Sequence, residues 1–165
     1  MSFGQRTIVL DHQGTLGSSY SENTRWIHKS VVFVGLNVPG SNNNNKVNDA
    51  TCLSSKSKRT QADCDADNLE FADRNAHNLA CLAQSFELAK ASGAIGLMVV
   101  IQGDPWFDLP ETETVNERSD AAFDGYNDLL QALVDASNAF TGQVVLVHGD
   151  THFVKCIVAS VRSLL

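Results

Sequence analysis

The sequence predicts an α/β fold in which a parallel sheet packs against helices. The first observation is a set of three short apolar runs rich in Val and Ile, at residues 31–37, 94–101 and 144–147. Runs that are apolar at nearly every position are typical of strands buried on both faces. The second observation is that segments with helical spacing separate these runs, so the connections are long enough for parallel pairing. This alternation of strand and helix predicts an α/β sheet.

The first half of the chain predicts a strand, a loop and a helix. The run at 31–37 stops at a Pro-Gly pair, which ends a strand. Residues 41–68 are mostly polar and show no periodicity, which predicts a long polar loop. Apolar residues then recur at steps of three and four, which predicts a helix over residues 68–91 with Asp67 or Asn68 as its cap.

The second half of the chain predicts strand and helix again. A strand at 94–101 leads into an acidic loop. Spaced apolar side chains predict a second helix that begins at about residue 123 and ends near Phe140. A third buried strand follows at 144–147, and residues 153–161 predict one more strand. We expect a single domain over residues 1–165, because this length fits one hydrophobic core.

Composition excludes several classes of protein. Of the 165 residues, 43% are hydrophobic and 19% are charged, which excludes a disordered or fibrous chain. The formal net charge of −7 argues against nucleic-acid binding, because a surface that follows phosphates needs clustered excess cations. No run approaches the roughly 20 apolar residues of a membrane helix, so no membrane partner is expected.

The four cysteines bear on the cellular compartment. Cys52, Cys64, Cys81 and Cys156 show no CxxC or CxxH spacing, so neither a zinc knuckle nor a redox pair is predicted. Two disulfides are possible, but Cys81 falls in a helical pattern and Cys156 in a strand pattern, which favours buried reduced thiols. The N-terminus lacks the apolar core of a secretory signal. We therefore expect an intracellular, cytoplasmic protein.

The predicted topology places three polar segments together. In a parallel sheet the carboxyl ends of all strands lie along one edge, and ligands bind in the crevice outside that edge. Residues 40–43, 102–105 and 148–152 leave the sheet there, and each segment combines Gly with side chains that can bind metal or phosphate. We therefore expect a functional site at this edge.

The last of these segments has the spacing of a metal site. His148, Asp150 and His152 lie two residues apart in a Gly-containing turn, so imidazole and carboxylate groups can face one cation. Asn42 or Asn43 can add an amide oxygen. A mixed nitrogen and oxygen donor set suits Mn, Fe, Zn or Mg. The structural alternative is that Asp150 caps a turn, and that the asparagines form a loop tip because Asn tolerates left-handed conformations.

Several segments resemble the calcineurin-like metallophosphoesterases. Residues 40–43 (Gly-Ser-Asn-Asn) are similar to the Gly-Asn-His-Asp/Glu motif of that family, and residues 149–152 (Gly-Asp-Thr-His) are similar to its Gly-His-x-His motif. The segments ENTRW, VPGSNNN, IQGDPW and VLVHGDTHF, with the helix around residues 72–78, look more closely like one subgroup of the family. The resemblance spans about residues 1–155 and corresponds to the C-terminal half of such a domain.

The resemblance implies a fold, a reaction and a set of residues. The fold would be a layered sandwich of sheet and helices, part of the metallophosphoesterase fold. A divalent metal ion (Mn, Fe, Zn or Mg) would supply a metal-bound hydroxide that hydrolyses a small phosphate ester. The residues implied are Asn42, Asp150 and His152 as metal ligands, His148 and Asn43 as catalytic residues, and Gln102 and Asp104 as substrate contacts.

Two departures from the family motifs support an alternative, a catalytically inactive truncated module. No segment upstream of Asn42 supplies both the Asp-x-His and the Gly-Asp motif, and Asn, Gln and Asp stand where the family has His. Paired cations need an anion between them, so this chain would bind one metal weakly or none. A sheet edge left uncovered by the missing strands would favour self-association.

A second alternative is a haloacid-dehalogenase-like phosphatase. Residues 8–16 resemble the Asp-x-Asp-Gly-Thr motif of that family, in which the first Asp, here Asp11, is the nucleophile. Residues 148–151 would then imitate its late Gly-Asp motif. Gln13 stands in the place of the general acid, however, and no convincing catalytic Lys is found.

Overall fold

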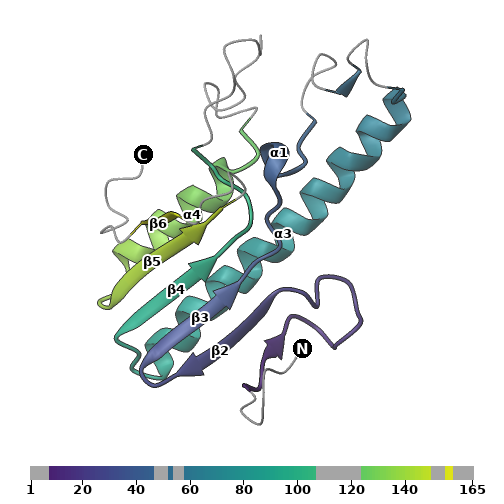
Figure 1. Cartoon of the computed structure of the whole chain (residues 1–165). Coiled ribbons are helices and arrows are strands. Elements are labelled where there is room, and N and C mark those ends of the chain that lie inside the picture. The colour runs from purple at the N-terminus through teal and green to yellow at the C-terminus, as the bar shows by residue number, and fades with distance from the viewer. Residues whose placement is uncertain (1–7, 47–51, 54–57, 107–123, 150–154, 158–165) are drawn as a thin grey trace.

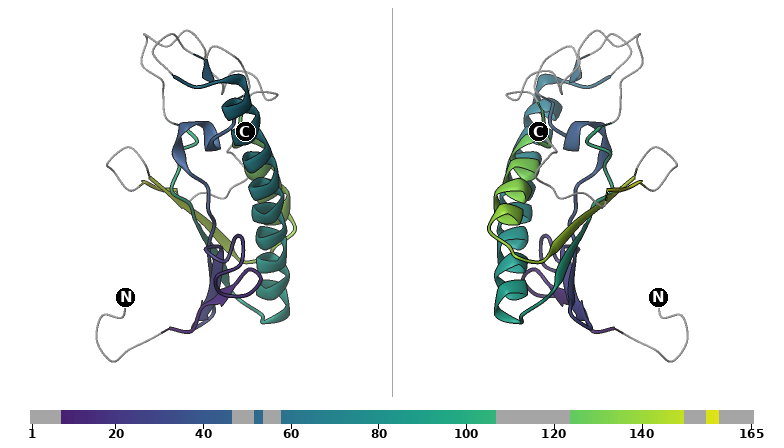
Figure 2. Two further views of the ribbon diagram at one scale, coloured as in Figure 1. Left: turned by 90° about the vertical axis from the view of Figure 1, so that its right-hand side faces the viewer. Right: turned by 90° about the vertical axis from the view of Figure 1, so that its left-hand side faces the viewer.

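The structure is a mixed α/β fold, which confirms the predicted class. The computed structural model describes residues 8–46, 52–53, 58–106, 124–149 and 155–157, the last of these by backbone alone. One sheet of six strands runs in the order β1-β2-β3-β4-β5-β6 (Figure 1). The helices α3 (Gln61–Ala91) and α4 (Asn127–Asn138) lie together on one face of that sheet (Figure 2).

The centre of the sheet is parallel, as predicted. The strands are β1 (Asp11–His12), β2 (Thr24–His28), β3 (Val31–Gly35), β4 (Gly96–Val100), β5 (Gln143–His148) and β6 (Lys155–Ile157). β3, β4 and β5 are parallel to one another, whereas β1, β2 and β6 each pair antiparallel with their neighbours. The three predicted buried strands correspond to β3, β4 and β5, and β6 lies within the strand predicted at 153–161.

The two faces of this sheet differ in burial. Val32, Val34 and Leu97 face the helices and are at most 1% exposed. Phe33 and Met98 lie opposite each other on the second face and are only partly buried. The expectation that these strands are buried on both faces is therefore wrong for the second face, because the helices that the structure describes cover only the first.

The strand β2 is not among the predicted elements. It forms a hairpin with β3, in which His28 pairs with Val31 across a turn of two residues. Lys29 takes a φ of 53° there, a conformation that hairpins usually fill with Gly or Asn. The turn therefore has no sequence signal. Trp26 of this strand stacks on Phe33 with 5.1 Å between ring centroids.

The helix α3 begins seven residues before the predicted start at residue 68. Thr60 caps it in a capping box, in which the Thr60 side chain accepts from the Asp63 backbone N–H and the Asp63 carboxylate accepts from the Thr60 N–H. Only Cys64 is buried among residues 61–73, and this part of α3 extends past the end of the sheet (Figure 1). Because this segment does not pack on the sheet, its sequence shows no helical spacing of apolar residues. The predicted loop over 41–68 is therefore wrong for its last eight residues, which are helical.

The second helix, α4, ends where the sequence predicts. It runs to Asn138, with Ala139 as its cap, and Phe140 follows. Phe86 of α3 meets Phe140 edge-on, with 5.8 Å between ring centroids, in the core that joins both helices to the sheet. In the described part of the chain, no helix combines the length and the apolarity that a membrane span requires.

The cysteines divide into a disulfide and a free thiol. Cys52 and Cys64 form a disulfide that ties the loop after β3 to the first turns of α3. Cys81 is buried and reduced, as predicted, and burial raises the pKa of its thiol. The prediction for Cys156 falls on a strand of which the side chains lie outside the description.

Candidate functional site

Three loops meet at the carboxyl edge of β3, β4 and β5. The Gly103 N–H donates to the Val38 carbonyl oxygen at 2.8 Å, and the Gly149 N–H donates to the Gln102 carbonyl oxygen at 3.1 Å. A side chain on Gly103 would place its Cβ 2.6 Å from the oxygen of Pro39, so the backbones approach as closely as only Gly allows. The described parts of the three predicted segments therefore lie side by side.

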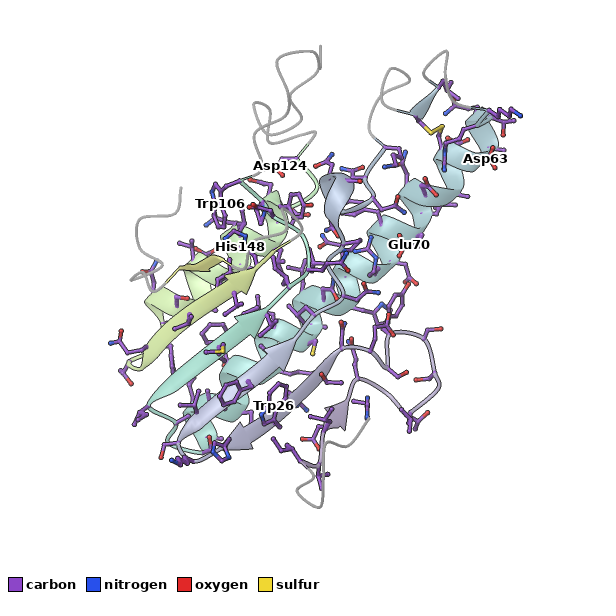
Figure 3. All side chains as sticks on the ribbon, viewed as in Figure 1. Trp26, Asp63, Glu70, Trp106, Asp124 and His148 are labelled. Carbon is purple, nitrogen blue, oxygen red and sulfur yellow. A yellow bond between two sulfur atoms is a disulfide. The ribbon has the colours of Figure 1, made fainter. Side chains whose placement is uncertain are left out.

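His148 and Asp104 form a buried pair within this edge. His148 Nδ1 lies 3.1 Å from Asp104 Oδ1, and both side chains are 1% exposed. The Trp106 ring lies 5.1 Å from the His148 ring, and the Trp106 N–H donates to Asp104 Oδ1 at 3.0 Å (Figure 3). The structure thus brings together a predicted catalytic residue and a predicted substrate contact, and it places both out of reach of solvent.

The asparagine run forms a left-handed turn. Ser41, Asn42, Asn43 and Asn44 have φ values of 53°, 55°, 55° and 61°, a region that residues other than Gly rarely enter and that Asn tolerates best. The Asn44 N–H donates to Ser41 O at 3.1 Å and the Asn45 N–H donates to Asn42 O at 2.9 Å. The left-handed conformation considered for a loop tip is therefore present, but it is anchored in the fold.

The side chains of this turn are bound to the segment before α4. Asn43 is 0% exposed, and its Nδ2 donates to Gly125 O at 2.8 Å. Asn42 Oδ1 accepts from the Gly125 N–H at 2.8 Å. Asn43, predicted to be catalytic, is an anchor of the turn in this structure.

Arg74 of α3 holds the turn from the other side, and no sequence pattern predicts this role. It is 2% exposed, and all five of its N–H donors are used. Nε donates to Glu70 Oε1 (2.5 Å), Nη1 to Asn43 Oδ1 (2.6 Å) and Asn37 O (3.2 Å), and Nη2 to Asn43 O (2.8 Å) and Glu70 Oε2 (3.1 Å). Arg74 holds the pKa of the Glu70 carboxyl below its usual range. A Glu-Arg pair four residues apart usually lies on a helix surface, so nothing in the sequence predicts that Arg74 is buried.

A network of amides holds Asn37, at the base of the same loop. The Asn37 N–H donates to Asn23 Oδ1 at 2.7 Å, and Asn37 O accepts from Asn78 Nδ2 at 2.8 Å. Asn23 Nδ2 in turn donates to Asn78 Oδ1 at 2.8 Å. Asn23 and Asn78 are both fully buried, so the loop is fixed by satisfied polar groups.

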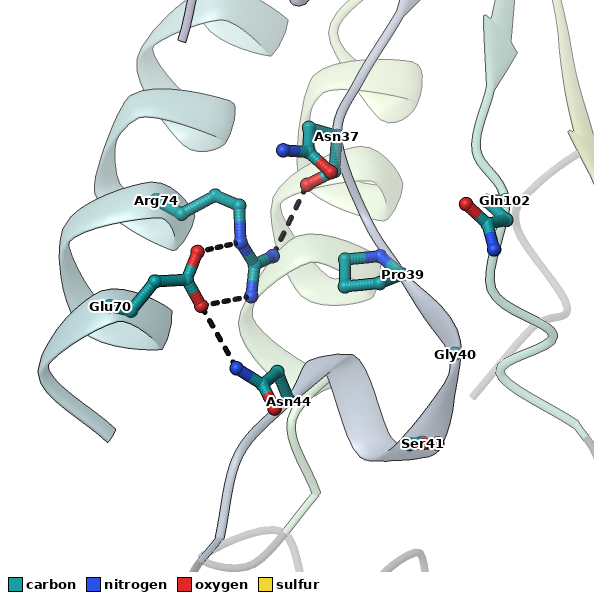
Figure 4. Close-up of a pocket in the computed structure, with 8 residues that line it drawn as sticks. All are labelled: Asn37, Pro39, Gly40, Ser41, Asn44, Glu70, Arg74 and Gln102. Carbon is teal, nitrogen blue, oxygen red and sulfur yellow. Dashed lines mark hydrogen bonds and ion pairs between the residues drawn. The ribbon is translucent and has the colours of Figure 1, made fainter. Parts of the chain in front are cut away.

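A hollow opens beside the turn. It measures about 550 Å³ and is lined by Asn37, Pro39, Gly40, Ser41, Asn44, Glu70, Arg74 and Gln102 (Figure 4). Gln102, predicted as a substrate contact, is exposed and lies on the wall opposite Arg74. The N-terminal half of α3 forms the wall that carries Arg74, and the left-handed turn lies between the two walls.

Two of the predicted metal ligands, Asp150 and His152, lie outside the residues that the structure describes. Among the residues that are described, no three His, Cys, Asp or Glu side chains gather closely enough to hold a metal ion. Asp11, the nucleophile of the second alternative, lies on β1, four strands from β5. At about 4.8 Å per strand, it is roughly 19 Å from the strand that carries His148, so the structure does not bring these two residues together.

Comparisons with known proteins found no relative. No protein-family model, curated protein or solved structure matches this chain. The fold and the site define a mixed α/β protein with a polar site at the carboxyl edge of its parallel strands.

Gly125 tests how tightly this edge is packed. Gly125→Ala would place Cβ 2.1 Å from the backbone oxygen of Asn42, so we expect a loss of about 3 kcal/mol in the free energy of unfolding, as for overpacked cores. Gly149→Ala is the matched control, since its nearest contact would be an ordinary 3.7 Å, and we expect a change below about 1 kcal/mol. Urea unfolding measures both, and equal losses would contradict the packing described.

Proposed function

We propose that this chain is a metallophosphoesterase-like domain that hydrolyses a small phosphate ester with a divalent metal ion (Mn, Fe, Zn or Mg). The supporting observation is the meeting of three loops, distant in sequence, at the carboxyl edge of β3, β4 and β5. Those loops carry the residues that the family resemblance assigns to the site. The partial metallophosphoesterase-like fold is part of the same proposal.

In this proposal the residues divide into ligands and positioning groups. Asn42 through Oδ1, with Asp150 and His152, would hold the metal, which when bound polarises phosphoryl oxygens and lowers the pKa of water. Asp104 holds His148 at 3.1 Å and thereby fixes the end of β5, immediately before the proposed ligands. Because His148 and Asn43 are buried, we assign them positioning roles. Gln102 is exposed on the hollow and would contact the substrate.

The second candidate is an inactive binding module with the same fold. One observation favours it: the Asn42 and Asn43 side chains are both engaged by Gly125. Asn42 Oδ1 would have to share its acceptor capacity between the Gly125 N–H and a cation, and Asn43 Oδ1 already accepts from the buried Arg74 guanidinium. Calorimetry with Mn²⁺ or Zn²⁺ separates the candidates, since the inactive module takes up no metal.

Hydrolysis of p-nitrophenyl phosphate and its bis ester tests the first proposal. We expect turnover that requires Mn²⁺ or Zn²⁺ and that falls at least 100-fold, on the order of one lost catalytic group, in His152→Ala. His28→Ala is the matched control, because His28 is exposed and pairs with the first residue of β3, at the opposite end of the sheet. If no divalent ion supports turnover, catalysis by this chain is excluded and the binding module remains.

The other expectations about partners and location stay predictions. Self-association through a sheet edge would use β1 or β6, which have two and three residues, and short edge strands pair poorly. The intracellular, cytoplasmic location also stays a prediction. The Cys52–Cys64 disulfide weighs against it, because disulfides are typical of oxidising compartments.

A further inference from the structure

The hollow beside the left-handed turn has the size of a ligand site. Its volume of about 550 Å³ lies within the range of small-molecule pockets. Figure 4 shows Gln102 on one wall, Glu70 and Arg74 on the facing wall, and Pro39, Gly40 and Ser41 between them. The chemistry of these walls determines what the hollow can bind.

The charged residues of the hollow offer no free donor or surplus positive charge to an anion. Glu70 and Arg74 are the charged residues that line it, and they form a two-point ion pair whose charges cancel. Each of the five Arg74 donors is bound to Glu70, Asn43 or Asn37. An arginine recognises phosphate through free donors of its planar fork. Arg74 has none, so the hollow does not fit a phosphate or carboxylate group.

Neutral polar groups line the rest of the hollow. In the described part of the chain, neither the Ser41 hydroxyl nor the Gln102 amide hydrogen-bonds to another protein group, and both residues are exposed. Asn44 uses its Nδ2 on Glu70 at 3.2 Å, and its Oδ1 stays available as an acceptor. A hydroxyl and two amides offer donors and acceptors without charge, which matches the hydroxyl groups of a sugar or of glycerol.

We infer that this hollow binds an uncharged, hydroxyl-rich group such as a sugar ring or glycerol. The role of this group as part of the substrate rests on the proposed function. The hollow would bind the alcohol part of the ester, and the phosphate would bind outside the hollow, beside the proposed metal ligands. The binding itself depends only on Ser41, Gln102 and Asn44, and therefore needs neither metal nor turnover.

NMR titration of the full chain with glucose, glycerol and inorganic phosphate, without added metal, tests the inference. We expect glucose or glycerol to shift the side-chain amide signals of Gln102 and Asn44, and phosphate to leave them in place. Gln102→Ala should weaken the glucose affinity at least fivefold. Gln131→Ala, an exposed residue of α4 that bonds to Asp135, should leave it unchanged. Shifts with phosphate but not with glucose or glycerol would overturn the inference.

A charge variant gives a second and opposite readout. Glu70→Gln removes the negative partner and leaves Arg74 with surplus charge, so we expect phosphate to begin to shift the signals of the hollow. Asp73→Asn is the matched control on the same helix, because Asp73 binds Tyr20 at 2.6 Å outside the hollow, and it should gain no phosphate binding. If Glu70→Gln stays folded by circular dichroism and gains no phosphate binding, the Glu70–Arg74 pair is not what excludes phosphate, and that part of the inference is wrong.

The two proposals fail separately. Glucose binding in a chain that hydrolyses no ester would contradict the proposed function but support this inference. Ester hydrolysis in a chain whose Gln102 and Asn44 signals respond to neither glucose nor glycerol would support the proposed function and overturn this inference.

Discussion

Arg74→Leu is expected to lower the free energy of unfolding by about 3 kcal/mol, because it removes a buried guanidinium that satisfies buried oxygens. The substitution leaves the Asn43 backbone and side-chain oxygens without the Arg74 donors, whereas Asn37 O keeps its bond from Asn78 Nδ2, and unpaired buried acceptors each cost about 1–3 kcal/mol. Urea unfolding followed by circular dichroism measures the loss. Arg74→Lys keeps the charge without the five-donor fork, so most of the loss should remain.

The control for this prediction is Lys90→Ala on the same helix. Lys90 forms an exposed pair with Glu87 at 2.9 Å, and exposed pairs contribute about 0–1 kcal/mol. The pH dependence gives a further check. Since Arg74 depresses the pKa of Glu70, the pair stabilises the fold above the unfolded pKa of Glu70, and the contribution is lost as the pH falls through the folded pKa. Arg74→Leu should remove this acid-side loss; if Arg74→Leu unfolds like Lys90→Ala, Arg74 is not the anchor described.

Reduction of the Cys52–Cys64 disulfide is expected to cost about 3 kcal/mol, the loop-closure value for a loop of about 15 residues. The two cysteines are 12 residues apart and each is 2% exposed. The bond closes a series of contacts in which the loop after β3 runs back along α3. In order along the loop, these contacts are Asn43 to Arg74, Asn44 to Glu70, Lys46 to Asn68 and Cys52 to Cys64.

Hydrogen exchange locates the effect of reduction. The Lys46 N–H donates to Asn68 Oδ1 at 2.7 Å, and we expect its exchange to accelerate when the disulfide is reduced. Amides of β4, in the centre of the sheet, should stay protected. A reductant should destabilise the native chain and have no further effect on Cys64→Ser. Equal urea midpoints for the oxidised and reduced native chain would refute this role of the bond.

Which parts of the fold could be predicted follows from what each segment packs against. β3, β4 and β5 lie in the core, so their apolar runs are visible in the sequence. The first half of α3 packs against a polar loop, and its contacts are amides, an ion pair and a disulfide, which leave no hydrophobic period. The hairpin of β2 turns at Lys29 with a positive φ, where no Gly or Asn marks the turn.

The candidate site divides in the same way. The edge of the sheet could be predicted, because parallel topology alone brings the three loops together. The roles of individual residues could not. Asn43 and His148 have the chemistry of catalytic groups, but burial and their partners Arg74 and Asp104 are tertiary facts that spacing does not encode.

The length of α3 has a consequence for any molecule that arrives at the sheet edge. At about 1.5 Å per residue, its 31 residues span roughly 46 Å. The half of α3 that extends past the sheet is held by its contacts with the loop after β3. A partner that binds at this edge therefore contacts a helix surface that is already ordered before binding. Since ordering mobile loops is a major cost of association, this preorganisation lets even a few weak hydrogen bonds produce measurable affinity.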